Sequence, residues 1–107
     1  MDEYGVVFTS CKTQEEAKGI AEALLLEKLA ACIQTETITS YYTWQEKLQE
    51  EKEVRLSIKT REVLYPQVET LIRKHHSYQV PEIIYMRIDH GSKEYLTWMN
   101  DVTKKYW

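Results

Sequence analysis

The chain has 107 residues, 43% hydrophobic and 29% charged, which suits one folded domain over residues 1–107 and argues against disorder. Its net charge of −3 gives little attraction for phosphate backbones or anionic membranes, so we expect no nucleic-acid partner. No apolar run approaches the roughly 20 residues of a membrane-spanning helix, and the first residues lack a signal-peptide pattern, so we expect no membrane partner and a cytoplasmic location.

The first predicted elements are a short buried strand and an amphipathic helix. The apolar run at residues 6–8 predicts the strand. Thr13, with Glu16 three residues later, is typical of a capping box at a helix start. Apolar residues then recur at helical spacing, which predicts a helix over residues 15–29.

Residues 31–60 predict a long β-hairpin. The first arm is rich in β-branched and aromatic residues and has no Gly or Pro. Ile33 has the opposite parity to Ile38 and Trp44, which predicts a bulge near residues 35–37.

The rest of the hairpin consists of a polar turn and a returning strand. Residues 45–52 predict the turn, and the acidic stretch 50–53, which overlaps its end, predicts a solvated surface. Val54, Leu56 and Ile58 alternate with polar residues, as in a strand. Arms of this length overhang their neighbours and expose unpaired backbone and aromatic groups, which favours a closed oligomer.

Three further elements complete the chain. A helix over residues 64–75 carries Pro66 in its first turn, where a missing N–H is tolerated. A strand follows at residues 82–89, and a last amphipathic helix runs from Tyr95 to Tyr106. The order β-α-β-β-α-β plus a helix predicts an α/β (α+β) fold of the ferredoxin-like type, with both crossover helices on one face of the sheet. The opposite face of the sheet must then be covered by something other than these two helices.

Five segments resemble the CutA divalent-cation tolerance family, in the same order and over nearly the whole chain. These are EKLAAC at 27–32, SYYTW at 40–44, EVRLSIKT at 53–60, HHSYQVPEII at 75–84 and YLTWM at 95–99. The resemblance implies a homotrimer in which long hairpin strands pair between subunits. It also implies a likeness in fold and assembly to PII signalling proteins, and a link to divalent metals, for which copper binding has been proposed.

Two positions depart from the family pattern. A bacterial member has a Cys at the end of its first strand, proposed to bind copper with the paired histidines. That position is Thr9 here, and Cys11 follows two residues later on the same expected face. Ser77 stands where the family often has Pro. We expect Cys11 and Cys32 to be reduced thiols, and copper binding to lack thiolate help.

His75 and His76 are the candidate metal ligands, since imidazole suits copper and zinc. Adjacent helical residues point about 100° apart, so the pair cannot easily chelate one ion within a helix. His75 continues the apolar stripe and is predicted to pack, whereas His76 faces the loop at 78–82. We therefore predict His76 as the main ligand of Cu²⁺ or another divalent cation, with no cofactor required.

Trp44, Lys59, Tyr78 and Glu82 belong to the matched segments and are predicted to meet at a subunit cleft. A Lys59–Glu82 pair there either holds a small polar ligand or orders the interface as a structural ion pair.

The sequence contains no GxSxG, HExxH, P-loop or GxGxxG motif, which argues against an enzyme. Three hypotheses remain: a metal-responsive binding protein, a PII-like signalling trimer that binds a small metabolite, and an RNA-binding module. The acidic balance makes the third the least favoured.

Overall fold

Four antiparallel strands form one sheet in the order β2-β3-β1-β4. The structure is a computed structural model that describes residues 3–105. Its elements are β1 (Tyr4–Cys11), α1 (Gln14–Leu26), β2 (Cys32–Trp44), β3 (Lys47–Arg61), a 3-10 turn (Glu62–Leu64), α2 (Tyr65–His75), β4 (Ile84–Ile88) and α3 (Lys93–Val102). This order and sheet topology confirm the predicted ferredoxin-like arrangement with an added helix.

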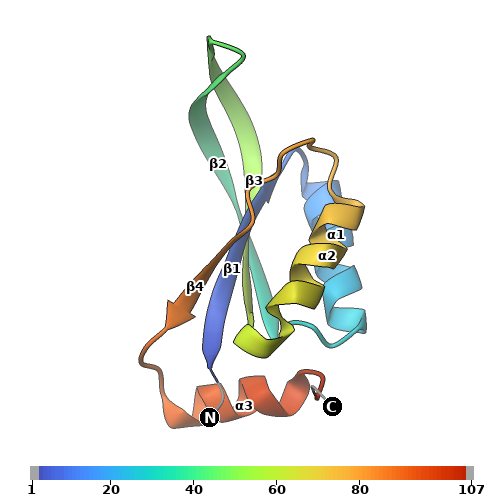
Figure 1. Ribbon diagram of the computed structural model, residues 1–107, viewed down its shortest axis with the longest axis vertical. Helices are drawn as coiled ribbons and strands as arrows, with labels where there is room; N and C mark the ends of the chain where they lie inside the picture. Colours follow the sequence, from blue (N-terminus) through green and yellow to red (C-terminus); the bar gives the residue numbers. More distant parts are fainter. Residues whose placement is uncertain (1–2, 106–107) are drawn as a thin grey trace.

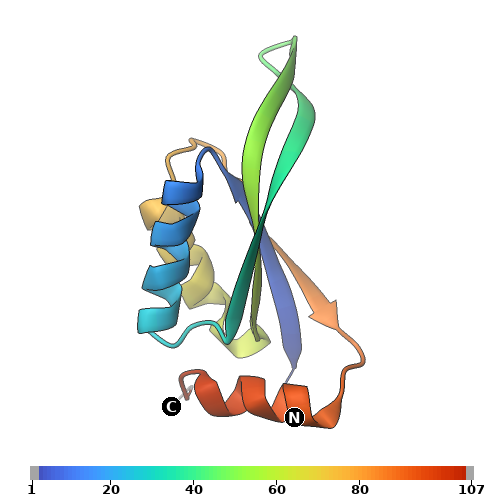
Figure 2. The same ribbon diagram turned by 180° about the vertical axis from the view of Figure 1, so that it is seen from behind.

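The core lies between the sheet and helices α1 and α2, which cover the same face (Figures 1 and 2). Alternate residues of β1 and β3 point toward these helices and are fully buried, as pleating requires. The main contributors are Val7, Leu56, Ile58, Ile20, Leu24, Val68 and Ile72. Helix α3 lies across the end of the sheet opposite the hairpin tip (Figure 1). Arg61 holds it there, donating from Nε to Thr103 Oγ1 at 3.0 Å.

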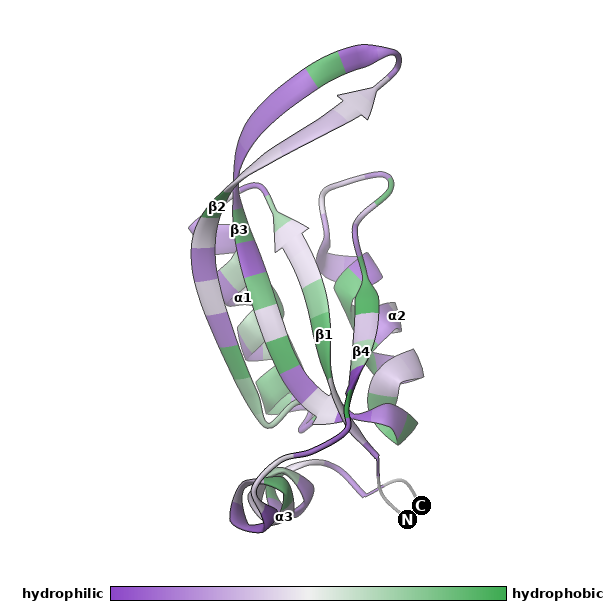
Figure 3. Cartoon of the chain, turned by 90° about the vertical axis from the view of Figure 1, so that its left-hand side faces the viewer, coloured by the Kyte–Doolittle hydropathy of each residue, from purple (hydrophilic) through white to green (hydrophobic). Residues whose placement is uncertain are grey.

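Neither α1 nor α2 covers the opposite face of the sheet, which looks toward the viewer in Figure 3. Apolar side chains on this open face remain in solvent, with Ile84 49% and Met86 57% exposed. None of the helices in the described part of the chain is long and apolar enough to cross a membrane.

The β2–β3 hairpin extends well beyond the rest of the sheet (Figure 1). Strand β1 pairs with β3 only as far as Val54, so the part of β3 from Lys47 to Glu53 has β2 as its neighbour. Pairing between β2 and β3 is continuous from Cys32–Lys59 to Trp44–Lys47.

This continuous register shows that the predicted bulge at 35–37 is wrong. The change of parity has another cause. Ile33 pairs with Ile58 on the helix-covered face, whereas Ile38 pairs with Glu53 on the open face, so apolar residues occupy both faces of one regular strand.

The predicted turn at 45–52 is also wrong, because the chain reverses at Gln45 and Glu46 alone. Both residues have positive φ, 52° and 67°, as in a two-residue hairpin turn of the primed type. Residues 47–52 are strand despite their polar composition. They lie in the overhang, where backbone pairing needs no apolar core on either side.

Other boundaries differ by a few residues. Strand β1 is longer than predicted, α1 ends at Leu26 rather than residue 29, and β4 is shorter than residues 82–89. Helix α1 cannot continue through Lys28, whose φ is 57°. Helix α3 begins at Lys93 and ends at Val102, where Thr103 takes extended backbone angles, so the helix predicted from Tyr95 to Tyr106 is wrong at both ends; Tyr106 itself lies outside the described residues.

Candidate functional site

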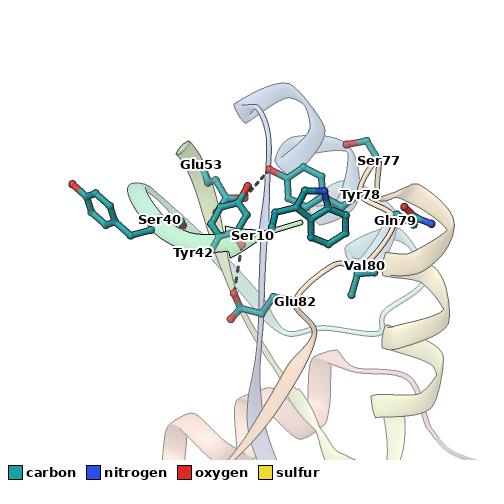
Figure 4. Close-up of a pocket in the computed structure, with 11 residues that line it drawn as sticks. Ser10, Ser40, Tyr42, Glu53, Ser77, Tyr78, Gln79, Val80 and Glu82 are labelled. Carbon is teal, nitrogen blue, oxygen red and sulfur yellow. Dashed lines mark hydrogen bonds between the residues drawn. The ribbon is translucent and has the colours of Figure 1, made fainter. Parts of the chain in front are cut away.

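A cavity of about 700 Å³ lies on the open side of the sheet, between the overhanging hairpin and the segment that follows α2. Figure 4 shows how β1, the hairpin and this segment each supply part of its lining. The lining residues are Ser10, Ser40, Tyr41, Tyr42, Trp44, Glu53, Ser77, Tyr78, Gln79, Val80 and Glu82.

Glu53 is the buried acidic group of this cavity, with only 6% of its surface exposed. Its Oε2 accepts a hydrogen bond from the Tyr78 hydroxyl at 2.6 Å, drawn in Figure 4. Burial first, and then this bond and the Glu53 charge, raise the pKa of Tyr78 far above its usual range, so Tyr78 acts as a hydrogen-bond donor. The prediction that residues 50–53 are solvated is therefore wrong at Glu53.

A second carboxylate, that of the exposed Glu82, lies at the other side of the cavity. The Ser10 hydroxyl donates to Glu82 Oε1 at 3.5 Å. Desolvation, followed by the charges of Glu51 and Glu53, raises the pKa of Tyr42 on the cavity wall. The described lining carries these two carboxylates and no Lys, Arg or His, so its field is negative.

His76 fixes the segment that bears Tyr78. Its side chain is 0% exposed. Its Nε2–H donates to the Ser10 carbonyl oxygen at 2.9 Å, and its Nδ1 accepts from the Tyr78 backbone N–H at 3.1 Å. These two bonds assign the proton to Nε2. Glu16 Oε2 also lies 3.6 Å from Nδ1.

The helical-stripe prediction for the two histidines is wrong, because His75 is exposed whereas the His76 side chain is buried. Helix α2 ends at His75, and His76 has extended backbone angles of φ −90° and ψ 138°. The 100° spacing of helical residues no longer applies after the last helical residue. The His76 ring therefore turns back toward the end of β1.

Glu16 adds a second attachment for the same segment. Its carboxylate accepts from the Ser77 backbone N–H at 2.7 Å and from the Ser77 hydroxyl at 3.0 Å. The capping box expected from the sequence is therefore half formed. Thr13 Oγ1 accepts from the Glu16 N–H at 3.1 Å, as predicted, but the Glu16 carboxylate is used on Ser77 instead of on the cap.

Of the predicted cleft residues, the structure brings Trp44, Tyr78 and Glu82 to one cavity and places Lys59 elsewhere. Lys59 Nζ lies 5.4 Å from the centre of the Tyr95 ring of α3, a cation–π contact. Within one chain, Lys59 and Glu82 thus do not form the expected pair.

The described residues contain no group of three or more His, Cys, Asp and Glu side chains placed to hold a metal ion. Cys11 and Cys32 are free, and burial with the nearby Glu16 charge raises the pKa of Cys11 to about 11. Thr9 faces the core and its buried hydroxyl has no partner among residues 3–105. Within residues 3–105 of one chain, His75 and His76 thus have no third ligand of these types beside them, and copper binding by this pair stays a prediction.

Comparisons with known proteins all match the same family. The family model of the CutA1 divalent ion tolerance protein matches residues 5–102. The Divalent-cation tolerance protein CutA of Pyrococcus horikoshii is 36% identical, over 94% of this chain and 98% of its own length. Mouse Protein CutA is 38% identical over 91% of this chain, which spans only 55% of the length of that relative.

Solved structures agree with this result. The periplasmic divalent cation tolerance protein CutA of Archaeoglobus fulgidus superposes with a TM-score of 0.93 at 32% identity, covering 94% of this chain and 99% of that one. CutA1 of Oryza sativa gives a TM-score of 0.93 at 36% identity, covering 96% and 95%.

The names of these relatives overturn the cytoplasmic location predicted from the sequence. The Archaeoglobus protein is described as periplasmic, and an Arabidopsis thaliana relative that is 37% identical is named chloroplastic. The match of the family model over most of the chain, together with full-length relatives at similar identity, leads to one assignment: the chain belongs to the CutA1 divalent ion tolerance family.

Proposed function

We propose that this protein serves divalent-cation tolerance as a homotrimeric binding protein whose ligand site is the cavity beneath the overhanging hairpin. The observation that carries the proposal is the cavity itself, which is built from β1, the hairpin and the segment after α2 and has a volume of about 700 Å³. Sites for small molecules commonly occupy 300–1,000 Å³.

The trimer is supported by surfaces that one chain leaves uncovered. Tyr41 is 73% exposed on the overhanging part of β2, and the open sheet face exposes Ile84 and Met86. Large apolar surfaces and long unpaired strand edges favour association, and a closed ring covers both without leaving an open end.

Binding fits the cavity better than catalysis. Cys11, the buried thiol near this region, has a pKa of about 11 and stays protonated at neutral pH, so it is a poor nucleophile. The described lining offers hydroxyl and carboxylate groups without a histidine or lysine base.

Direct copper binding through His75 and His76 is the second candidate, favoured by the divalent ion tolerance of the matched family. Both ring nitrogens of His76 already have internal partners, and His75 is exposed. A specific copper site then needs ligands from a second copy, with His75 as the available imidazole. The relatives named above give no support to a PII-like signalling role.

The first test is light scattering at micromolar concentration, where we expect the mass of three chains; a stable monomer contradicts the proposal. The second is calorimetry with Cu²⁺ and Zn²⁺ and a thermal-shift screen of small metabolites on the assembled protein. Trp44→Ala, in the cavity wall, is expected to abolish ligand binding. Leu48→Ala, on the same hairpin but outside the lining, is the matched control. Equal affinity in both variants would remove the cavity as the site.

A further inference from the structure

The most unusual group in the cavity is the Glu53 carboxylate. Carboxylates are almost never this buried unless a cation is paired with them. Glu53 is 6% exposed, yet none of the ion pairs among residues 3–105 includes it. Its one hydrogen bond, from the Tyr78 hydroxyl, engages Oε2 and leaves Oε1 without a donor in the described part of the chain.

Nearby cationic side chains on the same strand are already engaged. Arg55 pairs with Glu36 at 3.0 Å and lies over the Phe8 ring. Lys52 donates to Thr39 Oγ1 at 3.1 Å. The buried negative charge thus faces the cavity without a counter-ion from this strand.

Aromatic rings form much of the remaining wall. Tyr42, Trp44 and Tyr78 all line the cavity, and Tyr42 and Trp44 share the open face of β2 with the cross-strand partner of Glu53. Tyr78 is anchored by its bond to Glu53 and by ring contact with His76 at 4.9 Å. Aromatic walls around a carboxylate are the usual recognition chemistry for ammonium groups.

We propose that the cavity binds an organic ammonium ion, with Glu53 as its counter-ion and Tyr42, Trp44 and Tyr78 as its walls. The inference rests on the proposed function, in that the cavity is the ligand site. An anionic ligand is disfavoured because the described lining has two carboxylates and no cationic side chain. A bare Ca²⁺ or Mg²⁺ ion needs about six oxygen ligands at fixed distances, whereas Glu53 and Glu82 lie at different sides of a wide cavity.

The test uses the assembled full chain and two probes of equal shape. Choline carries a quaternary ammonium group, and 3,3-dimethylbutan-1-ol is its neutral carbon analogue. Calorimetry should show choline binding at least about tenfold more tightly than the alcohol, since the cation–π and charge terms are lost in the neutral probe.

Glu53→Gln keeps the side-chain shape and an acceptor for the Tyr78 hydroxyl but removes the charge. We expect it to weaken choline binding by about tenfold or more. Glu50→Gln makes the same charge change at an exposed position outside the lining and should leave the affinity within about twofold. Unchanged light scattering of both variants verifies assembly.

Equal binding of choline and its neutral analogue overturns the ammonium inference, as does a Glu53→Gln variant with unchanged affinity. The absence of detectable binding at a choline concentration of about 10 mM also overturns the ammonium inference. A neutral or anionic compound that binds the wild type and is lost in Trp44→Ala would overturn the ammonium class while the cavity-binding function stands.

Discussion

Replacing His76 with Ala is expected to destabilise the fold in the absence of any metal. The side chain is 0% exposed and links the end of β1 to the segment after α2 through two hydrogen bonds, to the Ser10 carbonyl and from the Tyr78 N–H. Each such bond contributes about 0.5–1.5 kcal/mol net. The ring contact with Tyr78 adds roughly 0.5–1.5 kcal/mol. We therefore expect His76→Ala to lose about 2–4 kcal/mol of the free energy of unfolding.

His75→Ala is the matched control, because it changes the same residue type one position earlier. His75 is exposed at the last residue of α2, and we expect it to lose less than about 0.5 kcal/mol. Urea unfolding in the presence of a chelator measures both losses. Protein concentration is held fixed, since the stability of an oligomer depends on it. Amide hydrogen exchange at Tyr78 should be slow in the wild type and fast in His76→Ala.

The reasoning fails if the two variants lose the same stability, or if the Tyr78 amide exchanges freely in the wild type. Loss of copper affinity in His76→Ala with no change in metal-free stability would also contradict it. That result would show that His76 serves mainly as a metal ligand.

Three further predictions follow from other parts of the fold. Gly5→Ala should cost about 1–3 kcal/mol in urea unfolding, since its Cβ would lie 2.2 Å from Tyr85 Cζ; a double variant with Tyr85→Leu should lose less than the sum of the single variants. Cys11 should react with a thiol reagent at pH 8 far more slowly than the half-buried Cys32, and equal rates would contradict its burial. The pKa of the Cys11 thiol rises from 9.0 to about 11 on folding, so the unfolded chain loses this proton at a lower pH than the folded chain does. The free energy of unfolding should therefore fall between pH 9 and 11 by at most about 2–3 kcal/mol. The Cys11→Ala variant should lack this part of the fall.

The order of helices and strands was predictable because the sequence signals for each element are local. Thr13 caps α1 through its own hydroxyl, and Pro66 marks the first turn of α2, so each boundary is encoded by a residue at that boundary. The alternation of Val54, Leu56 and Ile58 likewise fixes the covered face of β3 without knowledge of its neighbours.

The hairpin was predicted with less accuracy because its outer half has no core beside it. Hydrophobic periodicity reports burial on one face, and residues 47–52 have no such face. Their strand pairing depends on backbone bonds to β2 and on the turn at Gln45 and Glu46. This turn lacks the Asn-Gly or Asp-Gly pair that usually signals a two-residue hairpin turn in a sequence.

The site was harder to predict because it depends on contacts between distant segments. Glu53 lies in an acidic stretch that indicates a solvated surface. In the fold it pairs with Ile38 of β2 and accepts a hydrogen bond from Tyr78, a residue 25 positions later in the chain, and neither contact can be seen in the acidic stretch itself. Lys59 was expected beside Glu82 from strand ends alone. Within one chain its ammonium group lies over the Tyr95 ring, which comes from a helix whose packing the strand pattern does not describe, and the pairing across a subunit cleft stays a prediction.

The segment from His75 to Tyr78 supports two different interpretations. Adjacent histidines indicate a metal site when they are considered as isolated ligands. In the fold, His76 bonds to Ser10 and Tyr78, while Ser77 bonds to Glu16, so the same residues attach this segment to β1 and α1. That attachment holds the Tyr78 hydroxyl on Glu53 and thereby closes one wall of the cavity. The motif thus has a physical role that needs no metal. It helps to enclose the buried carboxylate of Glu53, and a ligand of the cavity must supply the positive charge that this carboxylate lacks within the described chain.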